Sequence, residues 1–127
     1  MLPSHEEALR ALRVADRDIV AFVALKKAPE VSLVSTCFFA QQAVEKCLKA
    51  VLFELGVEFP PIHDLARLAL ILQDNNVVPS LSVDELRRLN PFAVTFRYDD
   101  MDIPLISVGE VAEMVIVIRD WAGEIVR

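Results

Sequence analysis

The sequence predicts an all-α fold, an antiparallel up-and-down bundle of four to five helices in one domain spanning residues 1–127. Apolar residues recur at three- and four-residue spacing through most of the chain. Ser-x-x-Glu patterns at Ser4, Ser82 and Ser107 match the capping box that starts a helix. The one alternating, strand-like segment, at 92–96, has no second such segment to pair with.

The first two helices are expected at about 5–27 and 31–55, on either side of Pro29. In the second helix, apolar residues cover a broad face, and Gly56 marks its end. In the first helix, the residues predicted to point inward are Leu9, Leu12, Ala15, Ile19, Phe22 and Val23.

The second half of the chain contains three further predicted helices. One spans about 64–75, and a short one starts at Ser82 and breaks at Pro91. Residues 91–106 are predicted to form an irregular, turn-rich connection. The last helix is expected at about 108–126, because a capping box precedes it and its apolar residues follow helical spacing despite a β-branched run.

Charge and hydropathy exclude several classes of function. The net charge is −6, with 13 basic against 19 acidic residues, so tight binding to long DNA or RNA is not expected. No apolar run has the length of a membrane span, and the first residues do not resemble a signal peptide. We therefore expect a cytoplasmic protein without a membrane contact.

Neither the two cysteines nor the acidic run at 99–102 indicates a cofactor site. Cys37 and Cys47 lie about 15 Å apart by helical rise, too far to form a disulfide, and are expected to be buried thiols. The acidic run at 99–102 lacks the glycine-turned loop of a calcium site and is interpreted as a solvated loop. No metal or other cofactor is expected.

One polar row on the second helix is the candidate for a functional site. Gln42, Glu45, Lys46 and Lys49 share a face, and His63 follows beyond the glycine turn. A purely structural interpretation is also available. Lys49 can pair with Glu45 for about 0.3–0.5 kcal/mol, and His63 can simply precede a helix cap, because aspartate, the next residue, is a preferred capping residue.

The segment 38–68 resembles the signature of HEPN domains, small helical proteins of prokaryotes often encoded beside a minimal nucleotidyltransferase. A second block, Leu89–Val94 followed by Arg97-Tyr98-Asp99, resembles a further block of that family. The matching residues of the first block are Gln41, Gln42, Ala43, Glu45, Lys46, Lys49, Ala50, Gly56, Pro60, His63, Asp64 and Leu65.

The resemblance implies a helical homodimer, and for many members it implies metal-free ribonuclease or toxin activity. Those enzymes carry an arginine followed four to six residues later by a histidine. Here the histidines are His5 and His63, and no arginine stands at that spacing before either one. Catalysis by this chain alone is therefore not expected, and no catalytic residue is assigned.

The leading hypothesis is a binding partner of a separately encoded nucleotidyltransferase, as in toxin–antitoxin-like systems, that holds a nucleotide or an RNA end. In this hypothesis, cationic side chains contact phosphate, and His63 and Tyr98 supply hydrogen bonds or stacking. The candidate ligand-binding residues are Gln42, Glu45, Lys46, Lys49, His63, Asp64, Arg97 and Tyr98.

Two alternatives stay open. A divergent metal-independent ribonuclease toxin would require His63 to meet Arg97 or Arg88 in a cleft. A structural interaction module would use all these polar groups in internal pairs, for example by pairing Arg97 with Glu45. The binding-partner hypothesis instead requires a pocket beside Lys46 and Lys49.

Overall fold

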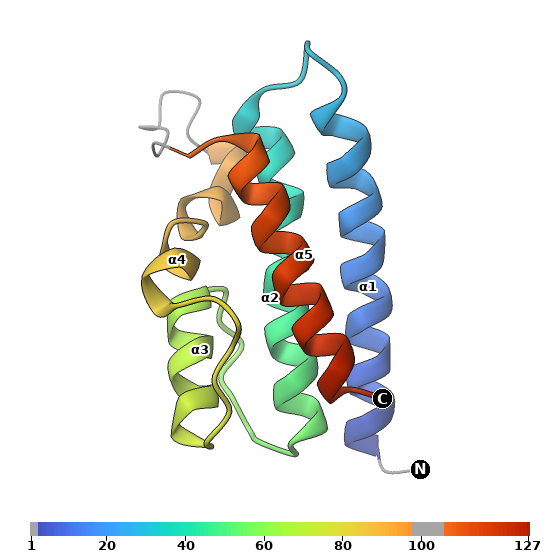
Figure 1. The fold of residues 1–127 in the computed structure, drawn as a ribbon, viewed down its shortest axis with the longest axis vertical. Coiled ribbons are helices and arrows are strands. Elements are labelled where there is room, and N and C mark those ends of the chain that lie inside the picture. The colour runs from blue at the N-terminus through green and yellow to red at the C-terminus, as the bar shows by residue number, and fades with distance from the viewer. Residues whose placement is uncertain (1–2, 98–105) are drawn as a thin grey trace.

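The computed structural model describes residues 3–97 and 106–127, where helices joined by loops make up the fold (Figure 1). No strand occurs among those residues, which confirms the predicted all-α class. The elements are α1 (Pro3–Lys26), α2 (Leu33–Glu54), α3 (Leu65–Asp74), α4 (Val83–Arg87), the 3-10 helix η1 (Asn90–Arg97) and α5 (Val108–Ile125).

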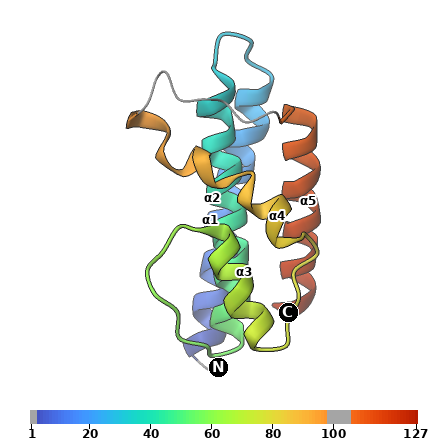
Figure 2. The ribbon, with the colours of Figure 1, turned by 90° about the vertical axis from the view of Figure 1, so that its left-hand side faces the viewer.

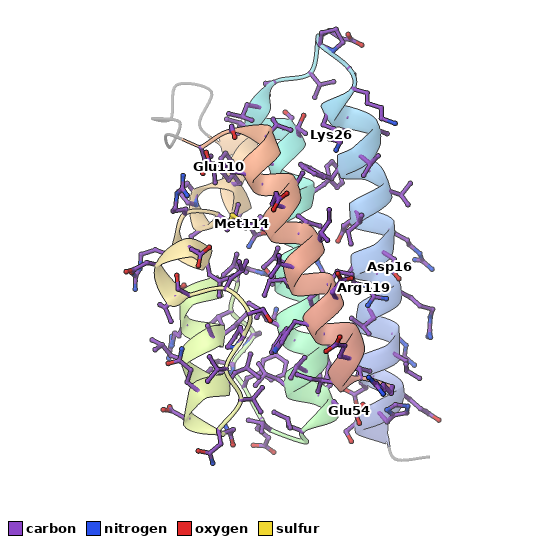
Figure 3. All side chains as sticks on the ribbon, viewed as in Figure 1. Asp16, Lys26, Glu54, Glu110, Met114 and Arg119 are labelled. Carbon is purple, nitrogen blue, oxygen red and sulfur yellow. The ribbon has the colours of Figure 1, made fainter. Side chains whose placement is uncertain are left out.

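Helix α2 lies at the centre of the bundle. It forms its most extensive contact with the antiparallel α1, and it also packs against α3, η1 and α5 (Figures 1 and 2). Helix α5 reaches α1 as well, where Arg119 donates from Nε to Oδ1 of Asp16 at 2.7 Å (Figure 3). Leu48, Val51 and Leu52 of α2 are completely buried, so this helix supplies much of the core.

The segment between α2 and α3 doubles back along α2 before α3 begins (Figure 2). As a result α3 runs in the same direction as α2, whereas α1 runs opposite to it. The start of α3 lies beside the middle of α2, where Nε2 of Gln41 donates to the backbone oxygen of His63 at 3.2 Å. This return path brings His63 next to the polar row of α2.

The helix-start signals have mixed outcomes. The capping boxes at Ser82 and Ser107 are both formed, with reciprocal bonds to Glu85 and Glu110, as predicted. The capping box at Ser4 is wrong, because α1 already includes Pro3 and Ser4 therefore lies inside the helix. Proline suits the first turn of a helix, where its missing N–H needs no partner.

Two other predictions need correction. Residues 90–97 form η1 rather than an irregular connection, and the rest of that predicted segment, 98–105, lies outside the described residues. Phe92 in η1 is completely buried, so burial of this ring holds the segment on the bundle. Val23 was predicted to point inward but is exposed, because α1 is covered over only part of its circumference.

The described helices include none that combines the length and the apolar character needed to cross a bilayer.

Candidate functional site

The polar row of α2 forms a connected hydrogen-bond network. Nζ of Lys46 donates to Gln42 at 2.8 Å, Gln42 donates to Oε1 of Gln41 at 2.6 Å, and Nε2 of Gln41 donates to Glu45 at 3.3 Å. Nζ of Lys49 donates to the other oxygen of Glu45 at 3.0 Å. The row is therefore one network rather than four independent solvated groups.

Glu45 is the buried centre of this network, with a side chain only 2% exposed. Nδ1 of His63 lies 3.0 Å from both carboxylate oxygens, while the imidazole itself is 69% exposed. An ionised carboxylate can only accept, so Nδ1 carries the proton and donates. In the neutral form of the ring, Nε2 of His63 is then the acceptor nitrogen.

The environment of Glu45 favours its charged form. Burial raises the pKa of this carboxyl, but the hydrogen bonds from His63, Lys49 and Gln41 oppose burial and leave the pKa below its usual value. A buried charge is tolerated when hydrogen bonds satisfy it on several sides. Glu45 thus holds the α2–α3 segment, through His63, against the middle of α2.

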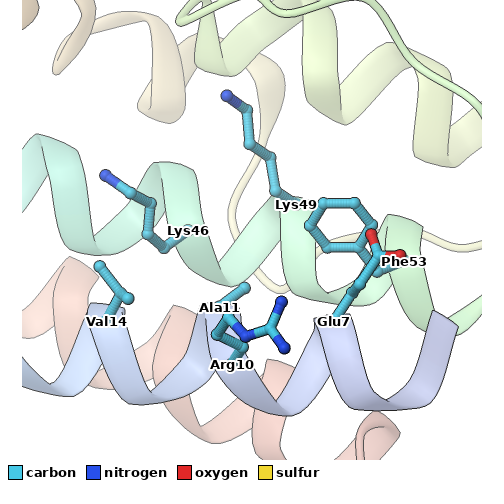
Figure 4. A pocket seen from close by; sticks show the side chains of 7 residues that line it. All are labelled: Glu7, Arg10, Ala11, Val14, Lys46, Lys49 and Phe53. Carbon is cyan, nitrogen blue, oxygen red and sulfur yellow. The ribbon is translucent and has the colours of Figure 1, made fainter. Parts of the chain in front are cut away.

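A groove of about 360 Å³ opens between α1 and α2, on the side of the polar row (Figure 4). Its size falls within the range of small-molecule sites. Helix α1 contributes one wall and α2 the other. The residues that line it are Glu7, Arg10, Ala11 and Val14 from α1, and Lys46, Lys49 and Phe53 from α2.

Three cationic side chains reach this groove, and they differ in how far they are already paired. Lys49 is 16% exposed and bound to Glu45, and Lys46 is 26% exposed and bound to Gln42. Arg10 is exposed and, among the described residues, makes no hydrogen bond or ion pair. The guanidinium of Arg10 therefore keeps its full capacity to bind an anion.

Asp18 lies next to Lys46, one of the residues that line the groove. Its Oδ2 lies 3.9 Å from Nζ of Lys46, and this buried oxygen accepts no hydrogen bond. Burial raises the pKa of Asp18, Lys46 lowers it and Glu45 raises it, and the net pKa lies above its usual value. Asp18 consequently offsets part of the charge of Lys46.

Most of the sequence-predicted site residues lie together. Gln42, Glu45, Lys46, Lys49 and His63 belong to the network described above. Asp64 serves as the N-cap of α3, accepting from the backbone N–H of Arg67 at 3.2 Å, as its structural interpretation predicted. The backbone of Arg97 ends η1, but its side chain and the whole of Tyr98 lie outside what the structure describes.

Arg10 and Phe53 line the groove but are not among the site residues predicted from the sequence. The signal was present as two matching rows, at 7, 10 and 14 on α1 and at 46, 49 and 53 on α2. Each row has the spacing of one helix face. Only the antiparallel packing of the two helices makes the rows meet.

Arg88 does not form the histidine–arginine site that the ribonuclease alternative requires. This arginine donates from its guanidinium to Oε2 of Glu110, at the start of α5, at 3.2 Å. His63 is instead paired with Glu45. In the described residues, no arginine is bonded to His63.

The cysteines offer no reactive thiol. Both are unpaired and buried, as predicted. Burial raises the pKa of Cys37 to about 11 and that of Cys47 to about 12, so neither forms a thiolate near neutral pH. Within the described residues, no group of three histidine, cysteine, aspartate or glutamate side chains is placed to hold a metal ion.

Comparison with known proteins gives one match. No curated protein and no solved structure matches the chain. The family model described as HEPN domain matches residues 8–125, nearly the whole chain, which includes both helices of the groove and the His63 segment. This match supports a role related to nucleotides or RNA. The chain belongs to the HEPN domain family.

Proposed function

We propose that this HEPN domain binds a nucleotide or an RNA end in the groove between α1 and α2, and that it does so without catalysing a reaction by itself. The observation that carries the proposal is that Arg10, Lys46 and Lys49 all line one groove of suitable size. Phosphate is the ligand group that such cations recognise.

Arg10 is the primary phosphate contact in this proposal. Its guanidinium has no bonded partner in the part of the chain that the structure describes, so binding a phosphate there breaks none of those bonds. Lys46 and Lys49 strengthen the local positive charge while remaining bonded to Gln42 and Glu45. Phe53, which lines the same groove, offers a ring against which a base can stack.

The protein works as a homodimer and as the partner of a separately encoded nucleotidyltransferase in this proposal. Apolar side chains remain uncovered on one chain: Val20 of α1 is 70% exposed, and Ile116 of α5 is 60% exposed. Such side chains are what a partner surface covers. The cytoplasm, where nucleotides and RNA are available, is the proposed compartment for this single-domain protein.

A titration with fluorescently labelled ATP and with a short labelled RNA tests the binding function. We expect saturable binding of one of these ligands, with an affinity reduced about tenfold by Arg10→Gln, since a charge-assisted phosphate contact is removed. Arg13→Gln is the matched control, because Arg13 is exposed on the same helix and does not line the groove. Absence of binding at millimolar ligand would refute the proposal.

A second candidate function rests on the Glu45–His63 pair. A buried carboxylate that holds Nδ1–H leaves Nε2 of an exposed histidine able to accept a proton, which is the arrangement of a general base. If the chain is a divergent ribonuclease, purified protein cleaves short RNA in the presence of EDTA, and His63→Ala abolishes cleavage. If the RNA stays intact with the wild-type protein as well as with His63→Ala, this candidate function is excluded.

A further inference from the structure

A second cavity of about 630 Å³ adjoins the groove between α1 and α2. Glu7, Lys49 and Phe53 line both cavities, and the two together are called the channel. The second cavity is bounded in addition by the segment that follows α2, including Glu58 and Phe59. The full channel is therefore longer than the phosphate site alone requires.

Two phenylalanines form an aromatic wall in this second half. The rings of Phe53 and Phe59 lie 5.2 Å apart between centroids at an interplanar angle of 59°, and both are half-buried. The segment that carries Phe59 is constrained by a left-handed Gly56, with φ of 67°, and by Pro60 and Pro61. The two rings therefore hold this arrangement in the absence of a ligand.

Charge changes sign along the channel. Arg10 and Lys46 line the first half only, and the exposed carboxylate of Glu58 lines the second half only. Lys49 and Glu7 lie where the halves join. A phosphate is attracted to the first half and repelled from the second, whereas the N–H groups of a base can donate to the carboxylates of the second half.

We propose, on the basis of the proposed function, that the channel's ligand is a free mononucleotide held in one orientation. Its phosphate lies at Arg10 and Lys46, and its base lies against the Phe53–Phe59 wall. Lys46 and Phe53 are separated by roughly 10 Å of helical rise, a span that suits one nucleotide. In an RNA strand the ribose carries a second phosphate on its 3′ oxygen. In this orientation that phosphate lies nearer Glu58 than the first one does, so the channel disfavours RNA.

Calorimetric titrations with AMP, ribose 5-phosphate and a five-residue oligoadenylate test this orientation. We expect AMP to bind roughly tenfold more tightly than ribose 5-phosphate, because only AMP has a base to stack. Phe59→Leu should remove this difference. Phe39→Leu is the matched control, since Phe39 is a half-buried ring paired with Phe38 at 5.3 Å and does not line the channel.

A second variant does not depend on the packing of an aromatic ring. Glu58 is exposed, so Glu58→Gln leaves the fold intact. Glu58→Gln should reduce the ratio of the AMP affinity to the oligoadenylate affinity several-fold, because the repulsion of a second phosphate is removed.

The outcomes separate this inference from the function on which it rests. Equal affinity for AMP and ribose 5-phosphate, or tighter binding of the oligoadenylate than of AMP, would overturn the inference and leave the groove as a phosphate site. If none of the three ligands bound, the proposed function would fail and the inference with it.

Discussion

The network around Glu45 and the groove beside Arg10 share the polar row of α2 but differ in how their polar groups are satisfied. At Glu45, both carboxylate oxygens accept bonds from His63, and Lys49 and Gln41 complete the set. In the groove, Arg10 has no bonded partner among the described residues, and Oδ2 of Asp18, which lies next to Lys46, accepts no hydrogen bond. The two regions contain similar residue types, but their polar groups differ in how many hydrogen bonds they already make.

This difference separates residues that hold the fold from residues that can bind a ligand. A group whose bonds are complete loses them when a ligand takes it, so little binding free energy remains. A group without bonds gives its full interaction to the ligand. The comparison assigns Glu45 and His63 mainly to structure, and Arg10 mainly to binding.

The largest effect is expected from Glu45→Ala. Removing this carboxylate leaves Lys49 and the α2–α3 segment without their central partner, and should lower the free energy of unfolding by about 2–3 kcal/mol. Urea unfolding measures this loss. Glu54→Ala is the control. Because Glu54 pairs with His5 nearer the surface, this variant should lose less than about 1 kcal/mol of unfolding free energy. A similar loss in both variants would contradict the structural role of Glu45.

The contribution of Glu45 should depend on pH in a defined direction. Its pKa in the folded protein is lowered from 4.5, so its contribution is fully present above the unfolded pKa and is lost as the pH falls through the lower folded pKa. The stability difference between the wild type and Glu45→Gln should therefore be constant from pH 7 to pH 5 and should shrink below pH 4. A stability difference between the wild type and Glu45→Gln that grew on acidification would contradict a lowered pKa of Glu45.

A smaller effect, of opposite sign, is expected from Asp18→Asn. The pKa of Asp18 is raised from 3.8, so its charged form opposes folding at neutral pH, and protonation in acid relieves this. The variant should gain no more than about 1 kcal/mol at pH 7, because solvent screens a partly exposed carboxylate. Urea unfolding at pH 7 and pH 3 should show the gain at pH 7 only.

The same variant has a consequence for binding. Because Asp18 lies beside Lys46, its neutralisation should raise the affinity of the groove for a nucleotide phosphate a few-fold. Destabilisation at pH 7 together with weaker phosphate binding would show that Asp18 supports the groove rather than opposing it.

The smallest stability effect is expected from Arg10→Gln. Since Arg10 is exposed and has no bonded partner in the described part of the chain, its replacement should change the free energy of unfolding by less than about 0.5 kcal/mol. The affinity loss described above would then occur in a fully folded protein. A large loss of stability would remove the distinction between the two regions.

The fold was predictable where local signals determined it. Ser82, Ser107 and Asp64 cap helices through bonds to residues three positions ahead, so their role can be recognised from the sequence. The failure at Ser4 arose because a proline before it can itself start the helix. The 3-10 helix was missed because its stability comes from burying Phe92 against distant residues, which no local pattern records.

The site was predictable only in part, for a related reason. Lys46, Lys49 and Glu45 lie on one helix, so their spacing placed them together. Arg10 enters from α1, and His63 reaches Glu45 only because the chain doubles back after α2. Contacts between elements depend on helix packing, and the sequence alone did not supply that packing.

The most direct test of the central claim is a two-dimensional amide NMR titration with AMP. We predict saturable shifts centred on Arg10, Lys46 and Phe53, with the amides around Glu45 and His63 changing less. A need for about tenfold more AMP to reach the same shifts in Arg10→Gln, but not in Arg13→Gln, would locate the phosphate in the groove. Spectra that stayed unchanged at millimolar AMP, or shifts centred on His63 instead, would contradict the account.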